Sequence, residues 1–142
     1  MKKVITLLFT IVLLTACSET TTYNYKFSGE SEYWEAEYSN KGTEKWGEKD
    51  GQRTYSNENS YKFVLKYKGS LEELSSLQKL EYSFEFNGFS SKSIVEFTDP
   101  PSSATFPVTG KDEAKVGKDE VIKVYVKWDE FEESFELHNN SK

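Results

Sequence analysis

Apolar residues, most of them aromatic, alternate with polar residues over one segment of the chain after another. This period of two is the strongest constraint on the fold. Successive side chains of a β-strand point to opposite faces, so alternation is typical of strands with one buried face. It covers residues 23–27, 34–38, 61–67, 80–86 and, more weakly, 93–97. No helical segments separate these runs in the regular way that a parallel sheet requires, so the pattern predicts an antiparallel all-β fold.

The last part of the chain allows a strand pairing to be predicted residue by residue. If Asp129 and Glu130 form a turn, one face pairs Ile122 with Leu137, Val124 with Phe135 and Trp128 with Phe131. The other face pairs Lys123 with Glu136 and Lys127 with Glu132, and only Val126 opposite Glu133 is mismatched. Because a shift of one residue would mix the two faces, we expect this register.

Three segments depart from the alternation. Ser70 and Glu73 match a helix capping box, and leucines follow at a spacing of three, which predicts a short helix. Residues 39–59 are polar and contain three glycines, and we expect loops around a short strand there. Residues 98–119 contain three prolines, which preclude a central strand over much of that segment. Its repeated Gly-Lys-Asp-Glu sequence indicates a solvated loop.

Together these patterns predict about seven or eight strands and one short helix in a single domain, residues 23–142. Short strands at close spacing favour an antiparallel β-sandwich, with an immunoglobulin-like sandwich or a small barrel as the alternatives. The chain has a single cysteine, Cys17, so disulfides within the domain are excluded. Its 9 Tyr, 10 Phe and 3 Trp must supply the core instead.

The first residues have the organisation of an export signal. Lys2 and Lys3 precede a short apolar run, which ends at Leu14-Thr15-Ala16-Cys17 and is followed at once by polar residues. An apolar run this short falls below the roughly 20 residues that a membrane-spanning helix needs. Leu14-Thr15-Ala16-Cys17 resembles the lipobox of bacterial lipoproteins.

That resemblance implies the fate of this end of the chain. Residues 1–16 would be a signal peptide, cleaved between Ala16 and Cys17, and Cys17 would carry a diacylglyceryl group with acyl chains such as palmitate. Two acyl chains hold a protein stably to a bilayer. We therefore expect an extracytoplasmic protein, lipid-anchored to the cell membrane, with residues 17–22 as a polar tether. Residues 27–36, which include Gly29-Glu30-Ser31 and Trp34, are also similar to segments of small uncharacterised Bacillus-type lipoproteins.

Charge limits the partners. The formal net charge is −6, and without residues 1–16, which include two lysines and no acid, it becomes 16 basic against 24 acidic residues, or −8. Nucleic acid requires a basic face, so we expect no nucleic-acid binding. The same charge opposes close contact of the domain with anionic lipid.

The sequence contains no recognisable catalytic motif. His138 is the single histidine, it lies near the end of the sequence, and no Gly-x-Ser-x-Gly or phosphate-binding glycine loop occurs. Glu35, Glu37, Glu81 and Glu85 fall on the polar phase of strands and read as solubilising partners of lysines. Glu48, Asp50 and Asp112 lack the spacing of a calcium loop. We therefore predict a non-enzymatic protein with no metal and no cofactor besides the lipid on Cys17.

Two aromatic residues stand out as candidate binding residues. Trp46 lies in the glycine-containing polar segment, and Tyr33 lies on the outward phase of its strand. Exposed rings anchor protein interfaces or stack on sugars. We expect a module that binds an envelope protein, with a cell-wall glycan as the alternative ligand.

Overall fold

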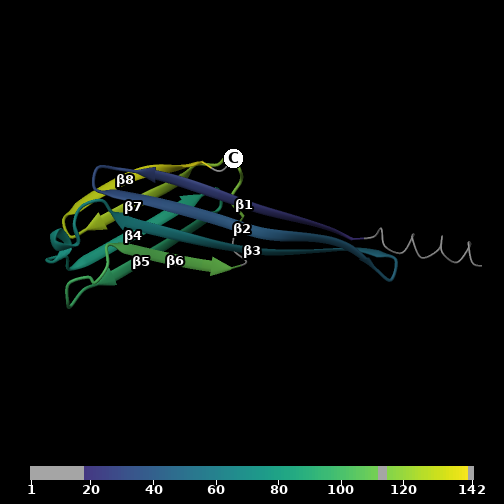
Figure 1. The fold of residues 1–142 in the computed structure, drawn as a ribbon, viewed down its shortest axis with the longest axis horizontal. Coiled ribbons are helices and arrows are strands. Elements are labelled where there is room, and N and C mark those ends of the chain that lie inside the picture. Colours follow the sequence, from purple (N-terminus) through teal and green to yellow (C-terminus); the bar gives the residue numbers. More distant parts are fainter. Residues whose placement is uncertain (1–17, 112–114, 141–142) are drawn as a thin grey trace, which may run out of the picture.

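The computed structural model describes residues 18–111 and 115–140, and these form one antiparallel sheet of eight strands (Figure 1). The strands are β1 (Glu19–Glu30), β2 (Trp34–Lys49), β3 (Gln52–Tyr67), β4 (Lys79–Phe86), β5 (Phe89–Glu96), β6 (Thr105–Lys111), β7 (Ile122–Trp128) and β8 (Phe131–Asn139). One 3-10 helix, η1 (Leu71–Leu74), joins β3 to β4. The order across the sheet is β5-β4-β7-β8-β1-β2-β3-β6.

The sheet curls into a half-barrel, and the predicted all-β antiparallel fold with one short helix is confirmed. One half of the barrel is formed by β5, β4, β7 and β8, and the other by β1, β2, β3 and β6. The two halves belong to one continuous sheet, because β8 pairs with β1. Phe27 and Ser28 pair with Asn139 and His138, and the Asn140 N–H donates to the Lys26 carbonyl at 2.8 Å. The architecture therefore lies between the predicted sandwich and its barrel alternative, with β5 and β6 as the edge strands.

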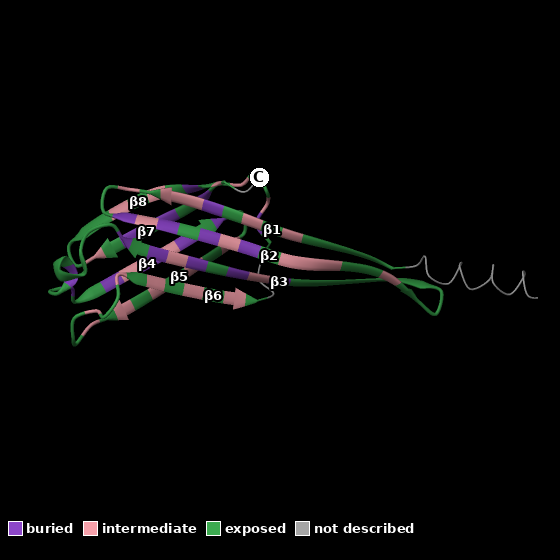
Figure 2. Ribbon diagram, in the orientation of Figure 1, coloured by how far each residue is buried: buried purple, intermediate pink, exposed green. Residues whose placement is uncertain are grey.

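The inner face of the curled sheet holds the core, and the predicted alternation places its residues correctly (Figure 2). Trp34, Ala36 and Tyr38 are buried along β2, while the residues between them point outward. Aromatic rings from opposite halves of the sheet meet at the centre, where Phe63 and Phe84 stack with ring centroids 4.6 Å apart. The predicted β7–β8 register is confirmed at every pair from Ile122 with Leu137 to Trp128 with Phe131.

A three-stranded arm projects from the half-barrel, and here the sequence-based prediction was wrong (Figure 1). We define the arm as residues 19–24, 42–49 and 52–59, joined at Asp50 and Gly51. Residues 39–59, expected as loops, continue β2 and β3, and residues 19–22, expected as a tether, form the start of β1. The ladder hydrogen bonds hold these strands together although only Asn59, at the base of the arm, is buried.

The turn at the end of the arm explains how the hairpin closes. Lys49 pairs with Gln52, so the loop has two residues, and both take positive φ, 52° at Asp50 and 79° at Gly51. Positive φ at both central residues defines the type I′ turn, whose twist matches that of the strands and for which Asp-Gly is a preferred sequence.

Residues 98–119 contain no central strand, as expected, but they do contain an edge strand, β6, that the sequence pattern did not predict. Pro107 lies within β6, which is tolerated because β6 is an edge strand and pairs only with β3. After the gap in the described residues, Val116 is fully buried, and its N–H donates to Asn40 Oδ1 at 3.4 Å. This segment closes the half-barrel where the arm begins.

The predicted helix exists as a single 3-10 turn, but without the predicted capping box. Ser70 is the N-cap and makes no side-chain capping hydrogen bond. The carboxylate of Glu73 instead accepts a hydrogen bond from the Tyr67 hydroxyl at 2.7 Å. Leu74 and Leu77 are buried as the leucine spacing predicts, but Leu71, the first leucine of that spacing, is 41% exposed.

Candidate binding surfaces

An exposed aromatic cluster lies at the end of the half-barrel opposite the arm. We call Tyr33, Trp128 and Phe131 the distal cluster. Tyr33 lies in the β1–β2 connection, and Trp128 and Phe131 flank the β7–β8 turn. The rings of Trp128 and Phe131 are stacked, with centroids 5.6 Å apart and planes inclined by 28°, and the centroids of Tyr33 and Trp128 are 6.1 Å apart. Phe131 is 63% exposed and Tyr33 is 45% exposed, so two of the three rings present much of their surface to solvent.

The core holds the distal cluster in place from beneath. The fully buried ring of Trp34 contacts Trp128 with centroids 5.6 Å apart in an edge-to-face arrangement. Trp34 also contacts Tyr67 at 5.1 Å. The exposed rings are therefore the outer layer of an aromatic stack that continues into the half-barrel, which keeps them rigid.

Glu133 ties the two turns of this end together. In the predicted register it was the mismatched residue, opposite Val126, and the structure shows its purpose. The carboxylate of Glu133 accepts hydrogen bonds from the Ser31 hydroxyl and from the Tyr33 N–H, the latter at 3.1 Å. An acid at this position of β8 therefore fixes the β1–β2 connection and with it Tyr33.

The β7–β8 turn is held from the other side by its own aspartate. Asp129 takes positive φ of 53°, and its carboxylate accepts from the N–H groups of Gln78 and Lys79, both at 3.1 Å. Trp128 and Phe131 flank this turn, so their position is fixed relative to β4 as well as to β1. The distal cluster is thus rigid on both sides.

Trp46, the other predicted binding residue, lies on β2 in the arm. Its ring contacts Tyr55 of β3 with centroids 4.4 Å apart, and the guanidinium carbon of Arg53 lies 4.9 Å from the ring centroid. Trp46 is 37% exposed and Tyr55 is 49% exposed. Thirteen residues of extended chain, about 40 Å, separate Tyr33 from Trp46, so the two predicted residues belong to different surfaces.

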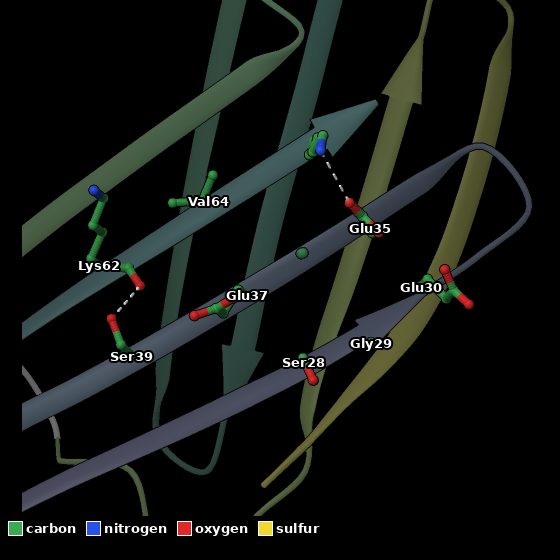
Figure 3. Close-up of a pocket in the computed structure, with 10 residues that line it drawn as sticks. Ser28, Gly29, Glu30, Glu35, Glu37, Ser39, Lys62 and Val64 are labelled. Atoms are coloured by element: carbon green, nitrogen blue, oxygen red, sulfur yellow. Dashed lines mark hydrogen bonds and ion pairs between the residues drawn. The ribbon is translucent and has the colours of Figure 1, made fainter. Parts of the chain in front are cut away.

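An open hollow of about 580 Å³ lies on the outer face of β1, β2 and β3 (Figure 3). Its side chains are mainly charged or small, and they come from the polar phase of these strands: Ser28, Glu30, Glu35, Glu37, Ser39, Lys62, Val64 and Lys66. Lys66 Nζ lies 3.8 Å from Glu35 Oε1, and the Ser39 hydroxyl donates to the Lys62 carbonyl at 3.5 Å. Glu35 thus lies beside a lysine, whereas Glu37 has Ser28 and Val64 as its cross-strand neighbours.

The other acids singled out in the sequence have similar surroundings. Glu81 accepts a hydrogen bond from Lys79, 3.1 Å away, and this contact lowers the pKa of Glu81. Glu85 accepts a hydrogen bond from the Tyr125 hydroxyl at 3.2 Å. His138 lies within β8, and Nε2 of its exposed ring is 3.6 Å from Glu136 Oε1. Glu48 and Asp50 lie near the turn of the arm.

No group of three or more His, Cys, Asp or Glu residues that could hold a metal ion occurs within residues 18–111 and 115–140. Within the same ranges, no helix is both long enough and apolar enough to span a membrane. Leu14, Thr15, Ala16, Cys17 and Asp112 lie outside the described residues.

No protein-family model matches this chain, and the searches of curated proteins and of solved structures found no match. Any function must therefore be inferred from the chain's own residues. Among its surfaces, the distal cluster combines exposed rings with a rigid support. Phe131 and Trp128 appeared in the sequence only as a predicted core pair. The signal for their exposure was their position next to a turn, where the sheet no longer covers them.

Proposed function

We propose that this chain is a non-enzymatic lipoprotein, anchored through Cys17 to the extracytoplasmic face of a bacterial cell membrane, which binds an envelope protein through the distal cluster. The Leu14-Thr15-Ala16-Cys17 sequence supports the anchor. The distal cluster supports the binding role, because Tyr33 and Phe131 lie exposed against Trp128, which packs in turn on the buried ring of Trp34.

Exposure of Phe131 is the observation on which the binding role depends. A phenylalanine that is 63% exposed and stacked on a tryptophan leaves a large apolar area in water, at roughly 25 cal/mol per Å². Covering it with a partner would recover that free energy. Aromatic anchors surrounded by polar residues are typical of the centres of protein interfaces. Here Glu133, Asp129 and Lys68 supply the polar surround.

The same observation favours a protein partner over a glycan. A sugar is held by polar side chains that bind its hydroxyl groups as well as by a ring face, and Phe131 offers no hydrogen-bonding group. Trp46, the other predicted binding residue, has Arg53 over its ring and Tyr55 against it, which leaves less of the ring face open to a sugar. A glycan therefore remains the alternative outcome of the test.

The test is site-specific cross-linking in intact cells. A photo-reactive amino acid replaces Phe131 in one strain and Val121 in a matched control, since Val121 is 37% exposed but lies just before β7, at the opposite end of that strand from Trp128. We expect a discrete protein adduct from position 131 and none from position 121. Equal labelling at both positions, or no specific adduct under any growth condition, would refute the binding role.

A parallel titration separates the glycan alternative. The tryptophan fluorescence of the purified protein is followed as soluble cell-wall fragments are added. Quenching that disappears in Phe131→Ser would transfer the role of the distal cluster from a protein to a glycan. We expect no quenching.

The anchor has its own test. Cells are labelled with a fatty-acid analogue, and wild type is compared with Cys17→Ala. We expect label in the wild-type protein alone, together with a mature chain that begins at residue 17. An unlabelled wild-type protein, or a chain that begins elsewhere, would remove the lipoprotein assignment while leaving the binding role of the distal cluster open.

A further inference from the structure

We propose that the end of the arm is a membrane contact: Trp46, Tyr55 and Arg53 lie in the headgroup layer of the bilayer beside the acylated Cys17, and the arm holds the acidic half-barrel away from the lipid. This inference rests on the lipid anchor of the proposed function, and it adds a defined lipid-facing surface and a defined orientation of the molecule.

The first observation is where the described chain begins. Glu19, the second described residue, pairs with Trp46, and Trp46 pairs on its other side with Tyr55. Cys17 is two residues before Glu19, and consecutive Cα atoms are about 3.8 Å apart. Two residues of chain can therefore span no more than about 8 Å. An acyl group on Cys17 brings the lipid surface to the end of the arm, and to no other part of the sheet.

The second observation is the chemistry at that point. Neither face of the arm is part of the core, so Trp46 and Tyr55 are not buried by the fold, and both remain well exposed. Tryptophan and tyrosine are enriched where membranes meet water, because their rings are amphipathic. The guanidinium of Arg53, stacked on Trp46, can bind a lipid phosphate through paired hydrogen bonds.

The third observation is the distribution of charge. The end of the arm comprises Glu19 and residues 45–55, since Glu19 pairs with Trp46. It contains three basic residues (Lys45, Lys49 and Arg53) and three acidic residues (Glu19, Glu48 and Asp50), a net charge of zero. Residues 17–142 together carry −8, so the rest of the mature chain carries all of that charge. Anionic lipid therefore repels the rest of the chain but not the end of the arm. The arm from Gly42 to Lys49 is about 23 Å long, more than the Debye length of about 8 Å at physiological salt.

The distal cluster fits this orientation. It lies at the far end of β2 from the arm, about 40 Å away along the strand. A molecule held by the end of its arm would therefore present Tyr33, Trp128 and Phe131 away from the membrane. In that position they face other components of the envelope.

The test supplies the anchor chemically, so that it does not depend on natural acylation. Residues 17–142 include every described contact and a single cysteine, Cys17, which is coupled to a maleimide lipid in phosphatidylcholine–phosphatidylglycerol vesicles. Brominated acyl chains in the same vesicles quench tryptophans that enter the bilayer. Because Trp46 is one of three tryptophans, we expect quenching of roughly a third of the emission.

Matched variants assign the quenching to a residue. Trp128→Phe, which removes a tryptophan of the distal cluster, should retain the quenched component, and Trp46→Phe should lose it. The double variant Trp46→Phe, Tyr55→Trp moves the probe to the paired strand and should restore the quenching, which shows that the arm is still folded. Unquenched wild-type emission, or equal quenching in Trp46→Phe, would overturn the proposal.

Acrylamide quenching distinguishes a second copy of the chain from lipid as the partner that covers the end of the arm. If Trp46 were shielded from aqueous acrylamide without vesicles, the arm would be covered by a second copy of the chain rather than by lipid, and the proposal would be wrong. If the fatty-acid label failed to appear in cells but the coupled protein showed the expected quenching, the proposed anchor would fail while the lipid affinity of the arm would stand.

Discussion

Asn40 is a buried polar residue at the place where the arm meets the half-barrel, and its replacement by aspartate gives a quantitative test of the structure. The Asn40 side chain is fully buried. Its amide nitrogen donates to Asn59 Oδ1 at 2.5 Å and to the Ser60 carbonyl at 3.0 Å, and its amide oxygen accepts from the Val116 N–H. Asn40→Asp keeps the shape and the acceptor but replaces the donor by an oxygen.

The expected cost follows from those contacts. Two hydrogen bonds are lost, at about 1 kcal/mol each, and a carboxylate is left facing two oxygen acceptors in a buried site. An uncompensated buried charge costs several kcal/mol more unless it is neutralised. We expect Asn40→Asp to lower the free energy of unfolding by about 3–5 kcal/mol at neutral pH. For about 120 residues this corresponds to roughly 12–20 °C in Tm.

The sign of the pH dependence is part of the prediction. Burial and the facing oxygens raise the folded-state pKa of the introduced carboxyl above its unfolded value of about 3.9. A raised folded-state pKa means that the variant is most stable below the unfolded pKa and loses stability as pH rises through the folded pKa. The protonated acid also regains one donor. The difference in stability between variant and wild type should therefore shrink as the pH falls from 7.5 to 4.5.

The assay is urea unfolding, followed by tryptophan fluorescence and far-ultraviolet circular dichroism at both pH values. Asn24→Asp is the control, because it is the same substitution at an exposed position of β1. We expect it to change the free energy of unfolding by less than about 0.5 kcal/mol. If Asn40→Asp cost under about 1 kcal/mol at neutral pH, or its cost did not fall on acidification, Asn40 would have to be hydrated and the packing of Val116 against it would be wrong.

Three further substitutions test other contacts. Gly29→Ala should largely prevent folding, since its Cβ would lie 2.0 Å from the Glu136 carbonyl oxygen and force β1 away from β8; soluble yield and Tm measure this, and wild-type values would contradict the pairing. Gly51→Ala should cost only about 1 kcal/mol, measured by urea unfolding, because φ is +79° but the space is open. The hydrogen bond to Glu73 raises the pKa of Tyr67 to about 12. Its stabilisation should be full below about pH 10 and lost as pH rises through the folded pKa. Glu73→Gln should lower that pKa in a tyrosinate absorbance titration, and an unchanged curve would exclude the contact.

The strands that could be predicted from the sequence are those with one buried face. Along Trp34, Ala36 and Tyr38 the alternation fixes both the strand and its inward side, and along β7 and β8 the paired charges on the outer face add the register. In each case the prediction succeeds because apolar and polar residues alternate within the strand itself, so that neighbouring residues show which side faces the core and which faces solvent.

The arm was missed because this contrast is absent there. Residues 42–59 are polar on both faces, so the sequence shows no alternation there. Their strands are held by backbone ladder hydrogen bonds, which almost any residue except proline can form. The signal that could have identified the hairpin is Asp50-Gly51, a preferred type I′ turn sequence. β6 was missed for a related reason: Pro107 argues against a central strand, and only the sheet order shows that β6 is an edge.

The candidate site was predicted in part. Tyr33 was singled out correctly as an exposed ring, and Trp46 as an exposed ring outside the core, although in a strand instead of a loop. The grouping of Tyr33 with Trp128 and Phe131 depends on Glu133, which joins residues about 100 positions apart in the chain. No pattern in a single sequence specifies such a contact.

The pairing of β1 with β8 has a consequence for how the chain acquires its structure. The half-barrel is joined between the first strand and the last, so its two halves cannot be united until nearly all of the polypeptide is present. Contacts this distant in sequence slow folding, because a long loop must close before they form. The hairpin of β2 and β3 can form earlier, because its two strands are adjacent in the chain. If the chain is exported, the arm can fold as it emerges, whereas a polypeptide interrupted before Phe131 would leave Phe27 and Ser28 without their neighbours and the aromatic interior open to water.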